Sequence, residues 1–145
     1  MRAEFQVLVL CYVILDEPRF LILKRSDMSI WQFVSGGGED NETPLEATIR
    51  ELYEETSIEI NDAVKLDTVC SIPKSIFKEH RDKSDIYIIP EYSFAVKLES
   101  EKILLSSEHI EYKFCTYEEG MKLLKYDSNR TALYELNERF NNDDL

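Results

Sequence analysis

The feature that most constrains this chain is residues 36–58, which read GGGEDNETPLEATIRELYEETSI. Thr43 and Glu46 have the spacing of a capping box, and Pro44 stands at the first helical position. A helix is therefore expected from Pro44 to Ser57. The three glycines just upstream predict a loop that is anchored directly to the start of this helix and whose backbone can approach a ligand closely.

Acidic side chains gather on one face of this expected helix. At about 100° per residue, Glu51, Glu54 and Glu55 project in similar directions. Ala47 precedes Glu51 by one turn on the same face, and its small side chain is expected to leave room for an approaching group. The opposite face is expected to be buried, and its members are Leu45, Ile49, Leu52 and Tyr53.

This acidic face has two interpretations. Like charges one turn apart destabilise a helix by about 0.2–0.5 kcal/mol per pair, so no fold requires them, but a solvated acidic surface tolerates them. The alternative is a site for hard divalent cations, which bind carboxylate oxygens and keep positions open for phosphate. The adjoining glycine segment favours the second interpretation.

The stretch resembles the Nudix box. That motif reads Gly, five residues, Glu, seven residues, Arg-Glu, an aliphatic residue, any residue, Glu-Glu, any residue, Gly and an aliphatic residue. The positions in register here are Gly36, Glu42, Arg50, Glu51, Leu52, Glu54, Glu55 and Ile58. One position departs, because Ser57 stands where the motif has a glycine that ends the helix in a left-handed turn.

The resemblance implies a single Nudix domain over residues 1–145, of the α/β (α+β) class, in which a mixed sheet is sandwiched between helices. It implies hydrolysis of a phosphoanhydride bond with Mg²⁺, which Mn²⁺ can replace. It also assigns the site: Glu51, Glu54, Glu55 and Glu108 as metal ligands with the backbone carbonyl of Gly36, and Arg50 as the residue that orients the glutamates. These residues apart from Gly36 form the expected catalytic set.

Segments outside the box are similar to the dihydroneopterin triphosphate pyrophosphatase branch of the family. These segments are residues 31–34, Glu108 and His109 with residues 112–114, and residues 128–133. Nudix enzymes commonly bring one further carboxylate to the metals from outside the box, and Glu108 matches that position. Otherwise Glu108 is one more surface glutamate in an acidic chain.

Five residues are expected to contact the substrate: Lys24, Arg25, Trp31, Ser35 and Gly37. Lys24 and Arg25 could hold phosphates or pair with nearby acids. Trp31 could stack on a ring or belong to the core.

Both histidines also leave two roles open. His80 lies with Arg81 in a polar segment that is either a lid or a solvated loop. His109 has either a structural role or a contact with phosphate.

Composition narrows the choice of partners. The formal net charge is −12, which should repel nucleic-acid polymers, anionic membranes and also a polyphosphate substrate unless cations intervene. The longest apolar run, residues 7–15, is too short to span a bilayer, and the residues before it do not predict a secretion signal. Cys11, Cys70 and Cys115 are expected to be buried free thiols in a reducing cytosol, so the protein is expected to be cytoplasmic.

The remaining segments predict a mixed chain of strands and helices. Strands are expected over residues 5–15, 20–24, 31–35, 64–72, 85–89, 91–98 and 111–115, with Pro90 breaking two of them apart. Residues 73–84 are expected to form a loop. A second capping box at Thr116 opens a helix to about Leu124, and a last helix is expected over residues 128–140.

Other functions remain open at this level. Within the enzymes, the substrate could be a dinucleoside polyphosphate, an oxidised nucleotide or a nucleotide sugar. A non-catalytic Nudix domain that senses a nucleotide is the alternative from another class, although it would be expected to lack the box carboxylates. In each case the partner is a small phosphorylated molecule, and the dimers formed by many relatives leave a homodimer open.

Overall fold

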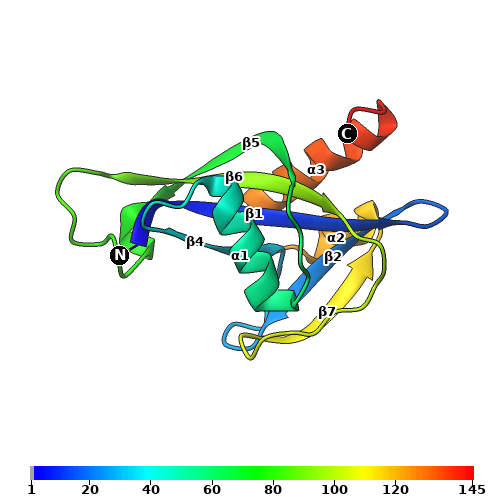
Figure 1. Cartoon of the computed structure of the whole chain (residues 1–145), viewed down its shortest axis with the longest axis horizontal. Coiled ribbons are helices and arrows are strands. Elements are labelled where there is room, and N and C mark those ends of the chain that lie inside the picture. Colours follow the sequence, from blue (N-terminus) through cyan, green and yellow to red (C-terminus); the bar gives the residue numbers. More distant parts are fainter. Residues whose placement is uncertain (1) are drawn as a thin grey trace.

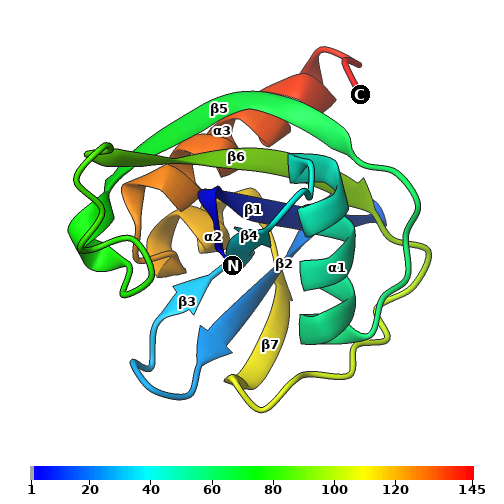
Figure 2. The same ribbon diagram turned by 60° about the vertical axis from the view of Figure 1, so that its left-hand side comes forward.

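The computed structural model describes residues 2–145, in which a seven-stranded mixed sheet carries helices on both faces (Figures 1 and 2). Helix α1 covers one face, and α2 and α3 cover the other. The elements in chain order are β1 (Arg2–Ile14), β2 (Pro18–Arg25), β3 (Trp31–Gln32), β4 (Val34–Glu39), α1 (Pro44–Thr56), β5 (Val64–Pro73), a short 3-10 turn (Lys74–Ile76), β6 (Ile88–Lys97), β7 (His109–Cys115), α2 (Tyr117–Leu123) and α3 (Asp127–Asn141). The expected α+β class and the helix–sheet–helix arrangement are confirmed.

Strand β1 is the centre of the sheet. It runs parallel to β6 along one edge, and along its other edge it pairs antiparallel with β4 and then with β2. The outer strands follow from these, because β5 pairs with β6, and both β3 and β7 pair with β2. Strand β4 leads into α1 and pairs with β1, whereas β7 pairs with β2, the strand that adjoins β1 on the same edge.

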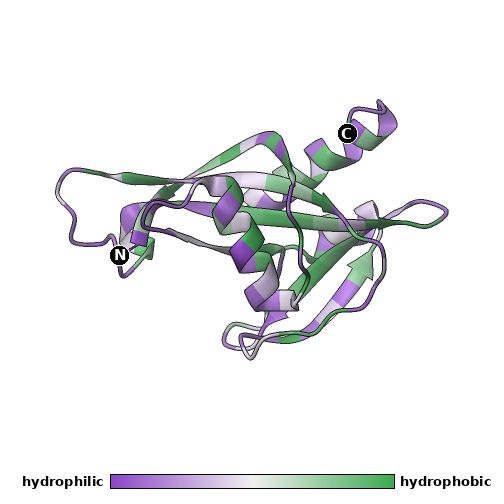
Figure 3. Cartoon of the chain, viewed as in Figure 1, coloured by the Kyte–Doolittle hydropathy of each residue, from purple (hydrophilic) through white to green (hydrophobic). Residues whose placement is uncertain are grey.

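The core has two layers because β1 is buried on both faces. Its side chains alternate, so that Leu8 and Leu10 pack under α3 while Val7 and Val9 pack under α1. A strand buried on both sides reads as an almost continuous apolar run, as in the hydropathy colouring of Figure 3. No helix within residues 2–145 is long and apolar enough to cross a membrane.

The prediction that Pro90 separates two strands is wrong. Strand β6 continues through Pro90, which pairs with Ser71 of β5, while pairing with β1 begins only at Glu91. Proline lacks a backbone N–H, and here the missing donor falls where β6 has a neighbour on one side only. Residues 85–87, expected as strand, precede it without regular structure.

The glycine segment is a strand and not a loop. Gly36, Gly37 and Gly38 lie in β4, and none of the glycines in the described part of the chain has a positive φ angle. These glycines let neighbouring side chains lie directly against the backbone of β4, because a Cβ atom on any of them would overlap such a side chain. The neighbour is Glu51 for Gly36, Arg2 for Gly37 and Phe5 for Gly38.

Both predicted capping boxes are present. The Thr43 side chain accepts a hydrogen bond from the backbone N–H of Glu46, and the Glu46 side chain accepts one from the backbone N–H of Thr43. Thr116 and Glu119 do the same at the start of α2. At the other end of α1, Ser57 adopts the left-handed conformation, with φ 62° and ψ 16°, as the departure from the box glycine predicted.

This strained cap yields a first prediction. Ser57→Gly is expected to raise the free energy of unfolding by roughly 0.5–1 kcal/mol, because a non-glycine residue in this conformation costs about 1–2 kcal/mol and the added chain entropy offsets part of the gain. A rise in melting temperature of about 1–3 °C should be seen by circular dichroism. Ser57→Ala keeps the Cβ atom and should give no such rise. Equal melting temperatures for the glycine variant and the wild type would contradict the strain at this cap.

Candidate active site

Helix α1 turns its acidic face toward the sheet and not toward solvent. Glu51 and Glu55 are buried, whereas Glu54 is exposed. Two predictions for this helix are wrong: Tyr53 is half exposed, and Ala47 is fully buried in the core beneath α1, so it does not leave an open approach. The sheet surface under Glu51 carries glycine, whereas Glu55 is buried against Ser106 and His109.

Gly36 of β4 makes this burial possible. A Cβ atom at Gly36 would overlap the carboxyl group of Glu51, so the absent side chain is the space that Glu51 occupies. The two box residues, 15 positions apart in sequence, are thus in direct contact. Close backbone approach is the reason for glycine here, since its φ is negative and no turn requires it.

Arg50 connects the acidic groups around the start of the site. Its Nε and Nη2 donate to the two carboxylate oxygens of Glu42 at 2.7 and 2.9 Å, and Nη2 also donates to the carbonyl oxygen of Gly37 at 2.9 Å. Its Nη1 donates to Glu51 at 3.0 Å and to Glu54 at 3.2 Å, so the predicted pairing one turn on is present. The rigid five-donor fork of arginine suits this arrangement, and lysine could not reproduce it.

Glu108, some fifty residues later in the chain, is brought to the end of α1. The segment before β7 is tied to the helix by the backbone N–H of Ser106, which donates to the carbonyl oxygen of Glu55 at 3.0 Å. The Ser106 hydroxyl donates to the Glu55 carboxylate at 2.8 Å, and Nδ1 of His109 lies 2.8 Å from the same carboxylate oxygen. The Glu108 carboxyl itself contacts that of Glu55.

The electrostatics show crowded negative charge. Burial raises the pKa of Glu51 from 4.5 to about 7, and although Arg50 opposes this rise, Glu54 and Glu55 add to it. Burial also raises the pKa of Glu55, but His109, Ser106 and Glu108 outweigh it, and the net pKa is below the usual value. The contact with Glu55 raises the pKa of Glu108 above its usual value.

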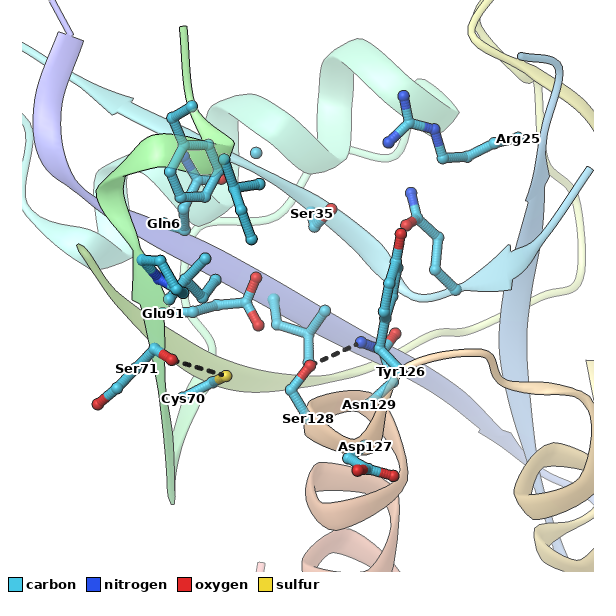
Figure 4. A pocket seen from close by; sticks show the side chains of 17 residues that line it. Gln6, Arg25, Ser35, Cys70, Ser71, Glu91, Tyr126, Asp127, Ser128 and Asn129 are labelled. Atoms are coloured by element: carbon cyan, nitrogen blue, oxygen red, sulfur yellow. Dashed lines mark hydrogen bonds between the residues drawn. The ribbon is translucent and has the colours of Figure 1, made fainter. Parts of the chain in front are cut away.

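Two adjoining cavities open beside these carboxylates. The larger has a volume of about 560 Å³ and the smaller about 370 Å³. Arg25, Gln32 and Ser35 line both, so the two cavities are neighbours, and together they are called the hollow below. Gly36 lines the larger cavity, and Glu108 with His109 lines the smaller. Figure 4 shows the larger cavity, with Arg25 far from the Cys70–Ser71 end.

The expected substrate contacts divide into two groups. Arg25 and Ser35 line both cavities, although the Arg25 guanidinium already donates to Asp27 at 2.9 and 2.6 Å. Lys24 instead pairs with Glu111 at 3.5 Å and lies over the ring of Trp31.

The other placements fit the structural alternatives. Trp31 packs on the hydrophobic core and lines neither cavity, which favours its core interpretation. Gly37 holds Arg50 through its carbonyl oxygen. His80 is fully buried beside Phe77, while Arg81 is exposed, so residues 73–84 are not simply a solvated loop.

Several residues of the hollow had no signal in the motif. Gln6, Gln32 and Glu91 are buried polar side chains that line the larger cavity, and Tyr126 lines it from the start of α3. The available signal was alternation: Gln6 and Glu91 are polar at positions whose neighbours on the same face, Leu8 and Ala95, are core residues. Of the thiols, all three are free and two are buried, but Cys70 is half-buried and lines the cavity.

The donor set fits a hard cation in its chemistry. As their side chains stand, no three carboxylate, imidazole or thiol groups among residues 2–145 form a ready-made ion site. Yet carboxylate oxygens gather in two adjoining groups, with Glu51 and Glu54 at Arg50 and Glu55 against Glu108. Burial raises the pKa of Glu51, and the contact with Glu55 raises that of Glu108. Oxygen donors of this kind are those that Mg²⁺ prefers.

These features define a class of protein: an α+β enzyme whose acidic helix borders a hollow of a size that suits a small phosphorylated molecule. A family model of the NUDIX domain matches residues 4–136. The chain belongs to the Nudix family, and it is a hydrolase that acts on phosphoanhydride bonds.

Individual relatives narrow the resemblance. The chain is 34% identical over 132 residues to the dihydroneopterin triphosphate diphosphatase of Haemophilus influenzae, covering 88% of this chain and 83% of that protein. A solved structure described as a NUDIX hydrolase from Listeria monocytogenes is 42% identical, with a TM-score of 0.88 over 98% of this chain and 97% of that one. The E. coli dihydroneopterin triphosphate pyrophosphohydrolase structure is 28% identical, with a TM-score of 0.76 over 94% of this chain and 97% of that one. The predicted similarity to this branch of the family is confirmed.

Proposed function

We propose that this protein hydrolyses dihydroneopterin triphosphate, or a closely related triphosphate, with Mg²⁺, and releases pyrophosphate. The observation that carries the proposal is the position of the Glu51–Glu55 face beside a hollow large enough for a bicyclic ring. The similarity to curated diphosphatases of this substrate over most of the chain supports it. A dinucleoside polyphosphate or another Nudix substrate is the alternative, and a sensing role is disfavoured because all box carboxylates are present.

Glu51, Glu54, Glu55 and Glu108 would hold the cations, with the carbonyl oxygen of Gly36 as a further ligand. When bound, Mg²⁺ supplies charge that neutralises the phosphates and makes an attacking water more acidic. Mn²⁺ should substitute, because it takes the same oxygen ligands. This requirement follows from charge: with a net charge of −12, the protein has few basic groups facing the hollow, and Arg25 is already paired with Asp27.

The chain's own residues have separate tasks in this proposal. Arg50 fixes the carboxylates of Glu42, Glu51 and Glu54 in one arrangement. Glu108, which is exposed at the edge of the smaller cavity and contacts Glu55, is placed to accept a proton from the attacking water. Ser35 lies between the two cavities, so the ring would lie on one side of it and the phosphates on the other.

The reaction breaks one P–O bond and forms another. Water adds to the phosphorus at one end of the bond between the α and β phosphates, its proton passes to a carboxylate, and the bridging oxygen leaves with the other phosphorus. The products are the monophosphate and pyrophosphate. Which phosphorus is attacked follows from the position of the ¹⁸O label after reaction in ¹⁸O-water.

The test is product analysis across a substrate panel. Dihydroneopterin triphosphate should give pyrophosphate in one step, with a higher kcat/KM than any common nucleoside triphosphate. Release of single phosphates, or a preference of about tenfold or more for a dinucleoside polyphosphate, would exclude this substrate while leaving the family unchanged.

Glu108 can be tested against a matched neighbour. Glu108→Ala is expected to lower kcat more than about tenfold, the lower end of what removing a general base costs. Glu111→Ala removes an exposed glutamate of β7 that pairs with Lys24 of β2, and it should leave kcat near wild type. Equal and small effects would assign Glu108 to the solvated surface.

A further inference from the structure

The larger cavity has an ionisable group that the reaction does not use. Glu91 on β6 is only 7% exposed and lines this cavity. Figure 4 shows its carboxylate pointing into the hollow, on the side opposite Tyr126. Within residues 2–145 its carboxylate makes no ion pair or side-chain hydrogen bond, so a buried carboxylate faces the cavity without a donor.

The fold explains why Glu91 faces the cavity. It is register-paired with Gln6 on β1 and with Cys70 on β5, and these three residues line the same hollow. Leu8 follows Gln6 by two residues on β1, and Ala95 follows Glu91 by four residues on β6. Both lie on the same face of the sheet as Gln6 and Glu91, and both belong to the core beneath α3. Glu91 therefore stands where the alternation predicts an apolar residue, at the end of the core layer that the cavity leaves open.

Such a placement costs stability unless a partner compensates. Burial raises the pKa of Glu91 to about 7, and no neighbouring cation or donor opposes the rise. A buried carboxylate is normally paired or hydrogen-bonded. The missing donors can come from a ligand in the cavity.

The geometry of a carboxylate selects the ligand. Its two oxygens accept two parallel N–H bonds, which is how it binds a guanidinium. A ring that contains a 2-amino-4-oxopyrimidine unit (pyrimidine numbering), as pterins and guanine do, presents the same pair: one ring N–H and one exocyclic amino group. Hypoxanthine keeps only the ring N–H, and adenine presents an acceptor there. The apolar side chains of the cavity, with Phe77 and Tyr126, suit the faces of such a ring.

We infer that Glu91 is the residue that selects a 2-amino-4-oxo ring by accepting its two adjacent N–H donors at the floor of the larger cavity. This inference rests on the proposed function for the position of the phosphates, but it concerns the ring. Gln6, beside Glu91, offers an amide that can contact the remaining polar atoms of the ring.

Ligands that do not turn over give a test that is independent of hydrolysis. GMP and IMP differ only in the 2-amino group, and their affinities can be measured by isothermal titration calorimetry. GMP is expected to bind at least about tenfold more tightly than IMP, because a site built for a donor pair rejects the analogue that leaves an acceptor unpaired. Glu91→Leu should bring the two affinities close to each other, and Glu91→Gln, which retains one acceptor, should give an intermediate ratio.

A control separates selectivity from net charge. Glu138→Gln removes one negative charge from the exposed face of α3, away from both cavities, and should preserve the preference for GMP. Circular dichroism should show that the Glu91 variants are folded, and Glu91→Gln keeps the test valid if the leucine variant is not. Equal binding of GMP and IMP by the wild type, no binding of either, or an unchanged preference in a folded Glu91 variant would each overturn the inference.

Kinetics with GTP and ITP then separate the two proposals. If both are sound, kcat/KM should favour GTP over ITP in the wild type, and this preference should be lost in Glu91→Leu while kcat for ITP stays similar. If GMP is preferred in binding but no triphosphate is hydrolysed, the ring inference stands and the proposed function fails. If pyrophosphate is released from both triphosphates at equal rates and IMP binds as well as GMP, the ring inference fails and pyrophosphate release stands.

Discussion

Removal of divalent cations with EDTA is expected to reduce turnover to background, and Mg²⁺ or Mn²⁺ in excess is expected to restore it. The physical reason is crowded negative charge: Glu51 and Glu54 share Arg50, and Glu55 contacts Glu108. Arg25, a cation in the hollow, is already paired with Asp27. A polyphosphate could not approach this charge unaided.

Circular dichroism of the EDTA-treated protein serves as the control, because its fold should be intact. A second readout does not depend on activity: Mg²⁺ binds the folded protein and should raise its melting temperature in a concentration-dependent way. Full turnover in EDTA, or a melting temperature that is insensitive to Mg²⁺, would remove the basis for metal-dependent hydrolysis here.

Glu51→Gln is expected to lower kcat by roughly 10²- to 10⁴-fold, the range for removal of an essential electrostatic group. Its stability in EDTA should hold or rise. At pH 8 Glu51 is ionised in both the folded and the unfolded chain, and a carboxyl group whose pKa burial raises from 4.5 to about 7 destabilises the folded state there. Glutamine removes that cost and can still accept the hydrogen bond from Arg50.

The comparison needs kcat and thermal unfolding on the same samples. Glu46→Gln is a suitable control on the same helix, because Glu46 is exposed and its capping contact can be kept by glutamine. A Glu51→Gln variant that is stable and turns over like the wild type would mean that Glu51 has only a packing role against Gly36. A Mg²⁺-induced rise in melting temperature that is as large in the variant as in the wild type would argue against Glu51 as a ligand.

The local features of this protein are determined by short-range physics and were therefore predictable from sequence. The two capping boxes depend on residues three apart, and the left-handed cap at Ser57 follows from where helix α1 must end. The buried strand β1 follows from its apolar run. The pairing of Arg50 with Glu54 follows from one turn of helix.

Other features depended on what packs against what, and only the tertiary structure decided them. The burial of Glu51 and Glu55 was not in the periodicity. It depends on Gly36 leaving space for Glu51 and on Ser106 and His109 covering Glu55. The glycines are a strand and not a loop because β1 pairs with them. Residue spacing within α1 thus indicated the acidic chemistry, whereas the sheet decided that it is buried.

The rest of the site was assembled across long sequence separations. The meeting of Glu55 with Ser106, Glu108 and His109 depends on the segment that leads into β7. The larger cavity is lined by Glu91 of β6 and by Tyr126 at the start of α3, so it depends on how these two elements are placed in the fold. The sequence by itself therefore determined the family and the carboxylate chemistry, because these lie within one local motif. Tertiary structure alone decided which side chains complete the site, because those contacts join strands and helices that are distant in the chain.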